Sequence, residues 1–330
     1  MMALSRGRFF LNAAMTVAAA ELAALGTAEA KNTSFPSIKQ VNAGVLDIGY
    51  ADLGPPTGTP VILLHGWPYD IHSYVDVAPI LAAAGYRVIV PFLRGYGSTT
   101  FLSKDTFRNA QEAAVALDVI DLMDALHIKK AVVGGFDWGA RTVGILGAIW
   151  PERCKAVVSV SGYLITDLPA NLKPLPPAGE YAWWYQYYFS TERGVLGYTQ
   201  YRHDFNKLIW QIVSPKWKFD DATFDRTAQA FENPDHVAIV IHDYRWRLSL
   251  AKGEHKYDAI QKKLAAKPDI GVPAITIASD FDGAGASGAA YRSKFTGKYE
   301  HRIFKGIGHN VPQEAPQPFA QAIIDADKMA

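Results

Sequence analysis

The segment GGFDWGAR at 134–141 constrains the fold of this chain more than any other feature of its sequence. It follows the apolar run KAVV, typical of a buried strand, and precedes TVGILGAIW, typical of a helix. Gly135 and Gly139 stand two residues before and two residues after Asp137. A sharp strand-to-helix turn requires small residues at these two places, because a Cβ there would collide with neighbouring backbone. The sequence therefore predicts that Asp137 projects from such a turn at the end of a sheet.

Strands and helices alternate along most of the chain. Short apolar runs predict buried strands, and longer runs between them predict helices. The expected strands are 61–64, 87–90, 130–133, 156–160, 273–278 and 300–304, and the expected helices are 75–84, 107–126, 142–150 and 313–329. This alternation predicts an α/β fold with a doubly wound, mostly parallel sheet.

Chemically competent residues follow three of the expected strands. Asp137 comes first, then the pair Asp280 and Asp282, and finally His309. Nucleophile, acid and histidine is the chain order of the α/β-hydrolase triad. We therefore predict an α/β-hydrolase fold. An aspartate at the turn, in place of serine, indicates alkylation of a carboxylate and not acylation of a hydroxyl.

From about Val45 onward the chain resembles the epoxide hydrolase and haloalkane dehalogenase branch of the α/β hydrolases. The motifs that carry the resemblance are HGWP at 65–68, DWG at 137–139, GH at 308–309 and EAP at 314–316. The resemblance implies that Asp137 attacks an sp³ carbon and forms an alkyl-enzyme ester, which water activated by His309 then hydrolyses. The branch places the acid that orients the histidine nine residues after the strand-opening proline, which gives Asp282, with Asp280 as the alternative.

Two backbone amides are expected to stabilise the negative charge that develops on the nucleophile's carboxyl during ester hydrolysis. The amide of Trp138 lies at the start of the helix after the turn, where free N–H groups converge. The amide of Trp67, in the HGWP loop, is the expected partner, whereas His65 in the same loop is expected to be a structural hydrogen-bonder.

Between 164 and 250 the alternation stops and aromatic residues become dense. The spacing predicts short helices, so we expect a helical lid here, inserted between two parts of the hydrolase core at 31–163 and 251–330. Most of the aromatic residues are expected to pack in the lid's own core. Tyr185 and Tyr244 resemble the two lid tyrosines of epoxide hydrolases, which implies that they donate protons to the epoxide oxygen.

The first thirty residues differ from the rest and are expected to be a signal peptide. Arg6 and Arg8 precede an apolar, alanine-rich run, and small residues allow cleavage after Ala30. The two arginines resemble a twin-arginine signal, although the pair of such a signal is adjacent. The run contains Asn and Glu, so stable membrane insertion is not expected. We predict a periplasmic or secreted protein, with a cytoplasmic protein as the alternative.

The predicted function is that of an epoxide hydrolase acting on a small apolar epoxide and forming a vicinal diol. A net charge of +1 and the absence of basic tracts argue against a nucleic-acid partner, and no motif indicates a cofactor or metal. The oligomeric state is left open. A haloalkane dehalogenase is the alternative, with Trp138 as a halide donor, and a non-catalytic binding protein is a third reading. Fluoroacetate dehalogenases carry arginine directly after the aspartate, so Trp138 argues against a charged haloacid.

Overall fold

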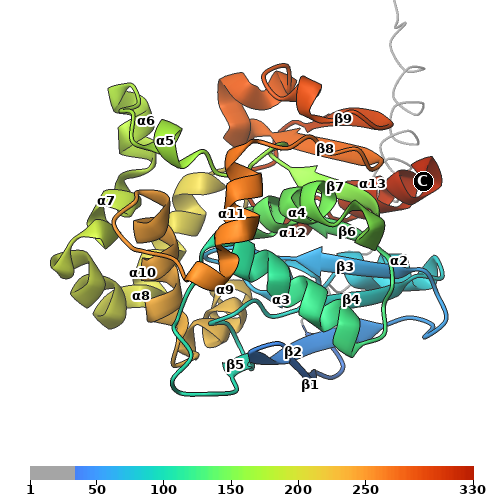
Figure 1. The fold of residues 1–330 in the computed structure, drawn as a ribbon, viewed down its shortest axis with the longest axis horizontal. Coiled ribbons are helices and arrows are strands. Elements are labelled where there is room, and N and C mark those ends of the chain that lie inside the picture. Colours follow the sequence, from blue (N-terminus) through green and yellow to red (C-terminus); the bar gives the residue numbers. More distant parts are fainter. Residues whose placement is uncertain (1–33) are drawn as a thin grey trace, which may run out of the picture. The chain divides into compact units, whose positions relative to one another are not determined.

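A central sheet of nine strands carries the fold of residues 34–330, the part of the chain that this computed structural model describes (Figure 1). The strands are β1 (Lys39–Ala43), β2 (Leu46–Leu53), β3 (Pro60–Leu64), β4 (Arg87–Pro91), β5 (Thr100–Phe101), β6 (Ala131–Gly135), β7 (Cys154–Val160), β8 (Ala274–Ser279) and β9 (Tyr299–Phe304). Their order is β1-β2-β4-β3-β6-β7-β8-β9, with β5 paired to β2. From β4 to β9 all neighbours are parallel, which confirms the predicted mostly parallel sheet.

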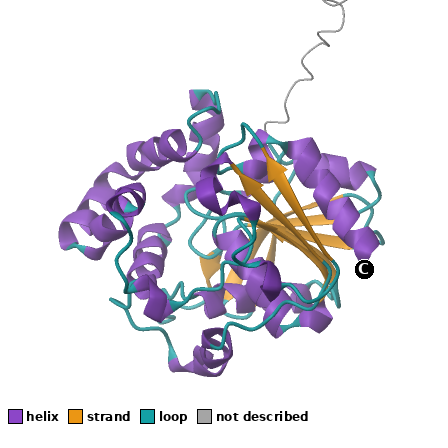
Figure 2. Cartoon of the chain, turned by 90° about the horizontal axis from the view of Figure 1, so that it is seen from above, coloured by secondary structure: helices purple, strands orange, loops and turns teal. Residues whose placement is uncertain are grey.

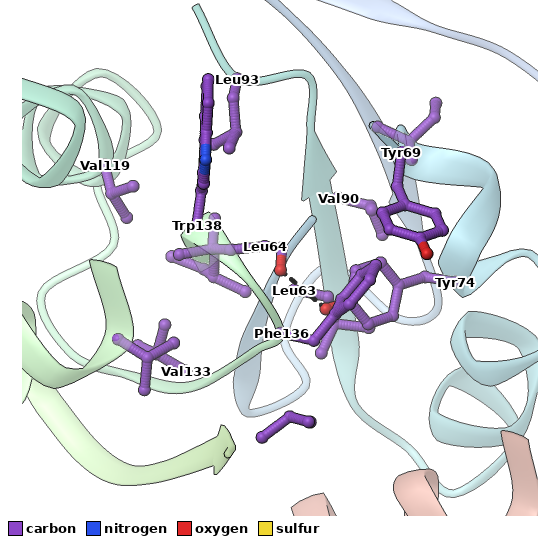
Figure 3. Close-up of a cluster of buried hydrophobic side chains, with 14 of the residues drawn as sticks. Leu63, Leu64, Tyr69, Tyr74, Val90, Leu93, Val119, Val133, Phe136 and Trp138 are labelled. Atoms are coloured by element: carbon purple, nitrogen blue, oxygen red, sulfur yellow. Dashed lines mark hydrogen bonds between the residues drawn. The ribbon is translucent and has the colours of Figure 1, made fainter. Parts of the chain in front are cut away.

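Helices cover both faces of the sheet (Figure 2), which explains why its central strands are apolar on both sides. On one face pack α3 (Glu112–Ala125) and α4 (Trp138–Ile149), and on the other α2 (Val77–Ala83) and α13 (Pro316–Met329). Every residue from Val61 to Leu64 is fully buried. The Tyr74 hydroxyl donates to the Leu64 carbonyl over 2.8 Å and fixes the end of β3 (Figure 3).

Several boundaries differ from the prediction. The antiparallel strands β1, β2 and β5 were not expected, because they lack the continuous apolar runs of the central strands. The helix expected over 107–126 begins only at Glu112, since Asn109 accepts from the Gln111 amide and holds a loop. The helix expected over 313–329 is divided at Pro316 into α12 (Val311–Glu314) and α13, because proline lacks the N–H that would continue a helix.

The segment 164–250, hereafter the lid segment, contains helices and no strand among its described residues. Its α-helices are α5 (Leu168–Asn171), α6 (Pro177–Ala182), α7 (Trp184–Ser190), α8 (Glu192–Val213), α9 (Asp221–Ala228) and α10 (His236–Arg247). They gather beyond one end of the strands, at the left in Figure 1, and α11 (Asp258–Ala265) leads back to β8. Within residues 34–330 there are also short 3₁₀ helices: η2 (Ile71–Tyr74), η3 (Pro151–Arg153), η4 (Gln229–Glu232), η5 (His255–Tyr257), η6 (Asp280–Ser287) and η7 (Arg292–Lys294).

The expected signal peptide at 1–30 lies outside the described residues. Within residues 34–330, no helix combines the length and apolar character needed to cross a bilayer.

Candidate active site

The turn after β6 holds Asp137 in the backbone conformation that the sequence predicts. Asp137 has φ +53° and ψ −123°, and α4 begins at the next residue. A Cβ on Gly135 would lie 2.5 Å from the carbonyl carbon of Gly139, and a Cβ on Gly139 would lie 1.9 Å from the Leu64 carbonyl oxygen. Both glycines are therefore required by backbone contact. Phe136 packs against Tyr69, and Figure 3 shows that the side chains of Phe136 and Trp138 point in different directions from the turn.

Gly139→Ala is expected to destabilise the protein, because its methyl group would meet a backbone oxygen that no rotamer change can move. We expect the free energy of unfolding to fall by roughly 1–3 kcal/mol or more, as for other overpacked sites. Urea unfolding followed by circular dichroism measures this. Gly285→Ala is the control, because a Cβ on Gly285 would have no atom within 4 Å. Equal stability of the two variants would contradict this account of the turn.

The carboxylate of Asp137 has a polar neighbour at each oxygen. The backbone N–H of Trp67 donates to Oδ1 over 2.8 Å, and His309 Nε2 lies 3.5 Å from Oδ2. Burial pushes the pKa of Asp137 upward, but the imidazole of His309 and the backbone amides of Trp67 and Trp138 outweigh it and hold the pKa below its usual value. Asp137 is therefore ionised at neutral pH, as a nucleophile must be.

Three aromatic rings fix the imidazole of His309. Tyr69 stacks on it with ring centroids 5.6 Å apart and planes at 13°, while Phe281 and Phe136 meet it edge-on at 4.4 and 5.9 Å. No sequence pattern indicated these contacts, because the three rings come from distant segments that only the fold brings together.

The backbone around His309 is held by a hydrogen-bond network that joins the lid segment to the core. Ser214, just after α8, accepts from the His309 amide over 2.9 Å and donates to Glu314 Oε1 over 2.7 Å. The second oxygen of Glu314 accepts from the Gly308 amide over 2.7 Å. Glu314 belongs to the EAP motif, whereas no sequence pattern identified Ser214.

The expected bond between His309 and Asp282 is not formed in this structure. The buried Nδ1 of His309 has no hydrogen-bond partner within residues 34–330. Asp282 Oδ2 instead accepts from the Ser279 amide over 2.8 Å, because Asp282 is the third residue of η6 and caps its start. Asp280 does not contact His309 either, because its carboxylate pairs with Lys216 over 2.6 Å at the surface.

The structure brings Tyr185 and Tyr244 together above the HGWP loop. Their side chains come from α7 and α10 and are almost fully buried, at 6% and 1% exposed. Their ring centroids lie 5.4 Å apart, and 5.0 and 5.2 Å from the ring of Trp67. Burial, the main cause, and the charge of Asp137 raise the pKa of both phenols. Both therefore keep their protons at neutral pH.

His65 makes structural hydrogen bonds. Its Nε2 accepts from the Leu93 amide over 3.1 Å, so Nδ1 carries the proton and donates to the Gly66 carbonyl over 3.1 Å. Burial lowers the pKa of His65 to about 4, so the ring is neutral. No group of three or more His, Cys, Asp or Glu within 34–330 is arranged to hold a metal ion.

The indole nitrogens of the two site tryptophans differ. Trp67 Nε1 donates to the Tyr198 hydroxyl over 2.8 Å and is not free for a ligand. Trp138 Nε1 is buried and has no partner among residues 34–330. The site thus offers one unused indole donor and two phenols beside the carboxylate.

Comparisons with known proteins agree with this geometry. A family profile described as the alpha/beta hydrolase fold matches residues 59–207. A crystal structure from Klebsiella pneumoniae, provisionally called an epoxide hydrolase, is 58% identical with a TM-score of 0.88, covering 91% of this chain and 100% of that one. Epoxide hydrolase B of Mycobacterium tuberculosis is 34% identical over 160 residues, which is 44% of this chain and 44% of the relative. Epoxide hydrolase 3 of Siraitia grosvenorii is 35% identical over 130 residues, which is 39% of this chain and 40% of that protein.

The chain belongs to the α/β-hydrolase family. Within that family it is similar to proteins that carry the name epoxide hydrolase, although the matched region spans less than half the length of the curated relatives.

Proposed function

We propose that this protein is an epoxide hydrolase, in which Asp137 opens an epoxide and His309 hydrolyses the resulting ester to release a vicinal diol. The observation that carries the proposal is the placement of two protonated, buried phenols, Tyr185 and Tyr244, beside an ionised carboxylate at the turn. An epoxide needs this combination, because its oxygen leaves as an alkoxide and requires a proton donor.

In the first step, Oδ2 of Asp137 forms a bond to an epoxide carbon while the bond from that carbon to the epoxide oxygen breaks. Oδ1 is held by the Trp67 amide and becomes the carbonyl oxygen of the ester. The departing oxygen takes the hydroxyl proton of Tyr185 or Tyr244.

In the second step, Nε2 of His309 takes a proton from water, and the water oxygen attacks the ester carbonyl carbon. Negative charge then develops on Oδ1 of Asp137, where the amides of Trp67 and Trp138 stabilise it. Collapse of this intermediate breaks the bond between the carboxyl carbon and the substrate oxygen, and that oxygen takes the proton of the new carboxyl group, which releases the diol and restores the carboxylate. The proton held by His309 then returns to the phenolate, so that the imidazole and the phenol are restored as well. We propose that the lid segment 164–250 excludes bulk water from these steps.

We propose that Asp282 supports the imidazolium of His309, although the two are not bonded in this structure. Asp282→Asn is expected to lower kcat by about 10²–10⁴-fold, because an amide cannot balance the positive charge of the ring. The amide oxygen can still accept from Ser279, so folding should be preserved. Asp280→Asn is the matched control and should change kcat by less than about 3-fold. Steady-state kinetics decide the point, and a larger loss at Asp280 would overturn the assignment.

Haloalkane dehalogenation is the second candidate, and the unpartnered Nε1 of Trp138 is the observation that favours it. A halide site commonly uses two N–H donors, but the indole of Trp67 is occupied by Tyr198. Assays of the purified protein with styrene oxide, a 1-bromoalkane and a simple ester separate the candidates. Turnover of the bromoalkane alone would replace the epoxide proposal.

We also propose that residues 1–30 direct export and are removed. The mature protein recovered from cells should then begin at Lys31, and an intact N-terminus would contradict this.

A further inference from the structure

Arg247, near the end of α10, is a buried cation whose side chain forms no hydrogen bond within the described chain. Its side chain is only 10% exposed, and its Nε is buried without a partner. The nearest carboxylate oxygen, Oδ2 of Asp243, lies 3.7 Å from its terminal nitrogen and is itself without a hydrogen bond. Of the five N–H donors of this guanidinium, the one on Nε is fully buried and unused, which is costly. This arrangement suits a residue whose partner is a ligand.

Arg247 lines a pocket of about 180 Å³ whose charged lining is entirely positive. Two further cations, Arg141 and Lys173, line it with Arg247, and no Asp or Glu is among the described residues that do so. The pocket shares Lys173 and Tyr187 with an outer groove of about 520 Å³. The outer groove also contains Glu180, whose carboxylate accepts from the Tyr187 hydroxyl, so the wholly cationic part is the inner pocket.

The carboxylates around the pocket do not fully compensate its cations. Arg141 is already paired, since it donates to the buried Glu112 over 3.1 Å. Burial raises the pKa of Asp243 to about 7, with Glu112 and Asp137 adding to the rise and Arg247 and Arg141 opposing it. Near neutral pH, Asp243 therefore compensates Arg247 only in part. Lys173 lies further out and is exposed.

The pocket adjoins the reacting groups. Arg141 lies one helical turn after Asp137, and its amide donates to the Asp137 carbonyl over 3.1 Å. The guanidinium of Arg247 lies 5.4 Å from the ring centroid of Tyr244. Trp183, also in the pocket wall, has its ring 6.2 Å from that of Tyr185. A group bound here would therefore lie one side chain away from each of the two phenols.

We propose that this pocket binds a carboxylate of the substrate, so that the protein prefers epoxides of amphipathic organic acids to wholly apolar epoxides. Arg247 is the main carboxylate ligand, and Arg141 and Lys173 add positive charge. A single guanidinium that is only partly compensated matches a monoanion, and its planar N–H pair matches the two oxygens of a carboxylate. The inference rests on the proposed function and names its substrate class.

The test compares medium-chain acids that carry a terminal epoxide with the primary amides of the same acids. Wild-type kcat/KM should be at least about 10-fold higher for the acid, because a buried charge-assisted bond is lost with the amide. Arg247→Gln should lower kcat/KM for the acid by about 10- to 100-fold and change that for the amide by less than about 3-fold. Arg245→Gln, on the same helix and bonded to Glu192 outside the pocket, is the matched control and should affect neither substrate. Wild type without acid preference, or equal losses on both substrates, would overturn the proposal.

Two further arms keep the result decisive. If Arg247→Gln does not fold, Lys173→Gln should still lower kcat/KM for the acid selectively, by about 3-fold, as expected for an exposed charge. Calorimetry on the Asp137→Ala protein should show that octanoate binds and that octanamide and inorganic phosphate do not. Phosphate binding without octanoate binding would contradict a carboxylate site. Octanoate binding by a protein that opens no epoxide would instead refute the proposed function and leave the site standing.

Discussion

Asp137→Ala and Asp137→Asn are expected to lower epoxide turnover by roughly 10⁴-fold or more, the loss typical of removing a nucleophile. We expect this loss because the Asp137 carboxylate accepts a hydrogen bond from the Trp67 amide and lies next to His309. Asparagine tolerates the positive φ of this turn, so the asparagine variant should fold. The measurement is kcat on styrene oxide, with circular dichroism as the check on folding. Full activity in either folded variant would place the nucleophile elsewhere.

His309→Gln should stop the reaction at a different point. Formation of the ester precedes the step that needs a base, so this variant should accumulate the alkyl-enzyme ester. Intact-mass spectrometry should then show an increase equal to the mass of the added epoxide, located on the peptide that contains Asp137. A variant that is inactive yet gains no mass would contradict the assigned order of steps.

Removing both phenol hydroxyls should nearly abolish epoxide opening. Tyr185→Phe and Tyr244→Phe keep the buried rings and remove only the proton donors, so packing around Trp67 should be preserved. Each single change should slow alkylation by about 10- to 1000-fold, because the leaving alkoxide depends on proton donation. Burial and the charge of Asp137 raise the pKa of both phenols, so both donors are in the protonated form across the neutral range.

Rapid-mixing measurement of the alkylation rate tests this, and Tyr188→Phe is the matched control. Tyr188 also lies in α7, but its ring stacks on Phe205 within the lid segment. The alkylation rate of the Tyr188→Phe variant should stay within about 3-fold of the wild-type rate. An alkyl bromide, if it reacts, should be much less affected than the epoxide, since bromide leaves without a proton. Normal epoxide opening by the double variant would refute the assigned role.

The features that could be predicted from the sequence are those set by local sterics and by strand order. Gly135 predicted the turn because a Cβ there would collide with the backbone of Gly139, four residues later. At Gly139 the colliding oxygen belongs to Leu64 in β3, so that requirement is a tertiary one. The parallel strands were predictable because burial on both faces leaves continuous apolar runs. The order of Asp137 and His309 after successive strands then predicted that both would lie at the same edge of the sheet, and they do.

The remaining features depend on tertiary contacts that no sequence spacing records. Tyr69 and Ser214 hold His309 from distant parts of the chain. The resemblance indicated Tyr185 and Tyr244, but periodicity could not show which lid rings face Trp67. The sequence analysis did not single out Arg247, because no motif or spacing indicates that this side chain is buried.

The Asp282 prediction illustrates a different limit. Counting from the strand-opening proline identified an acid after β8. It could not predict the rotamer of that side chain or the backbone amide that competes for its carboxylate. In this structure the Asp282 carboxylate accepts from the Ser279 amide, and Nδ1 of His309 has no acceptor among residues 34–330. Sequence spacing identifies a residue but not which of two nearby donors its side chain meets.

A single-turnover reaction in oxygen-18 water tests the central claim, a covalent ester on Asp137, most directly. With enzyme in excess over the epoxide, water attacks the ester carbonyl and the bond between the substrate carbon and Oδ2 is kept. We therefore predict that the diol formed in the first turnover contains ordinary oxygen in its new hydroxyl group, and that the heavy isotope appears in the carboxylate of Asp137. A first-turnover diol that carries the heavy isotope, with no label on Asp137, would contradict the account, because water would then have attacked the epoxide directly.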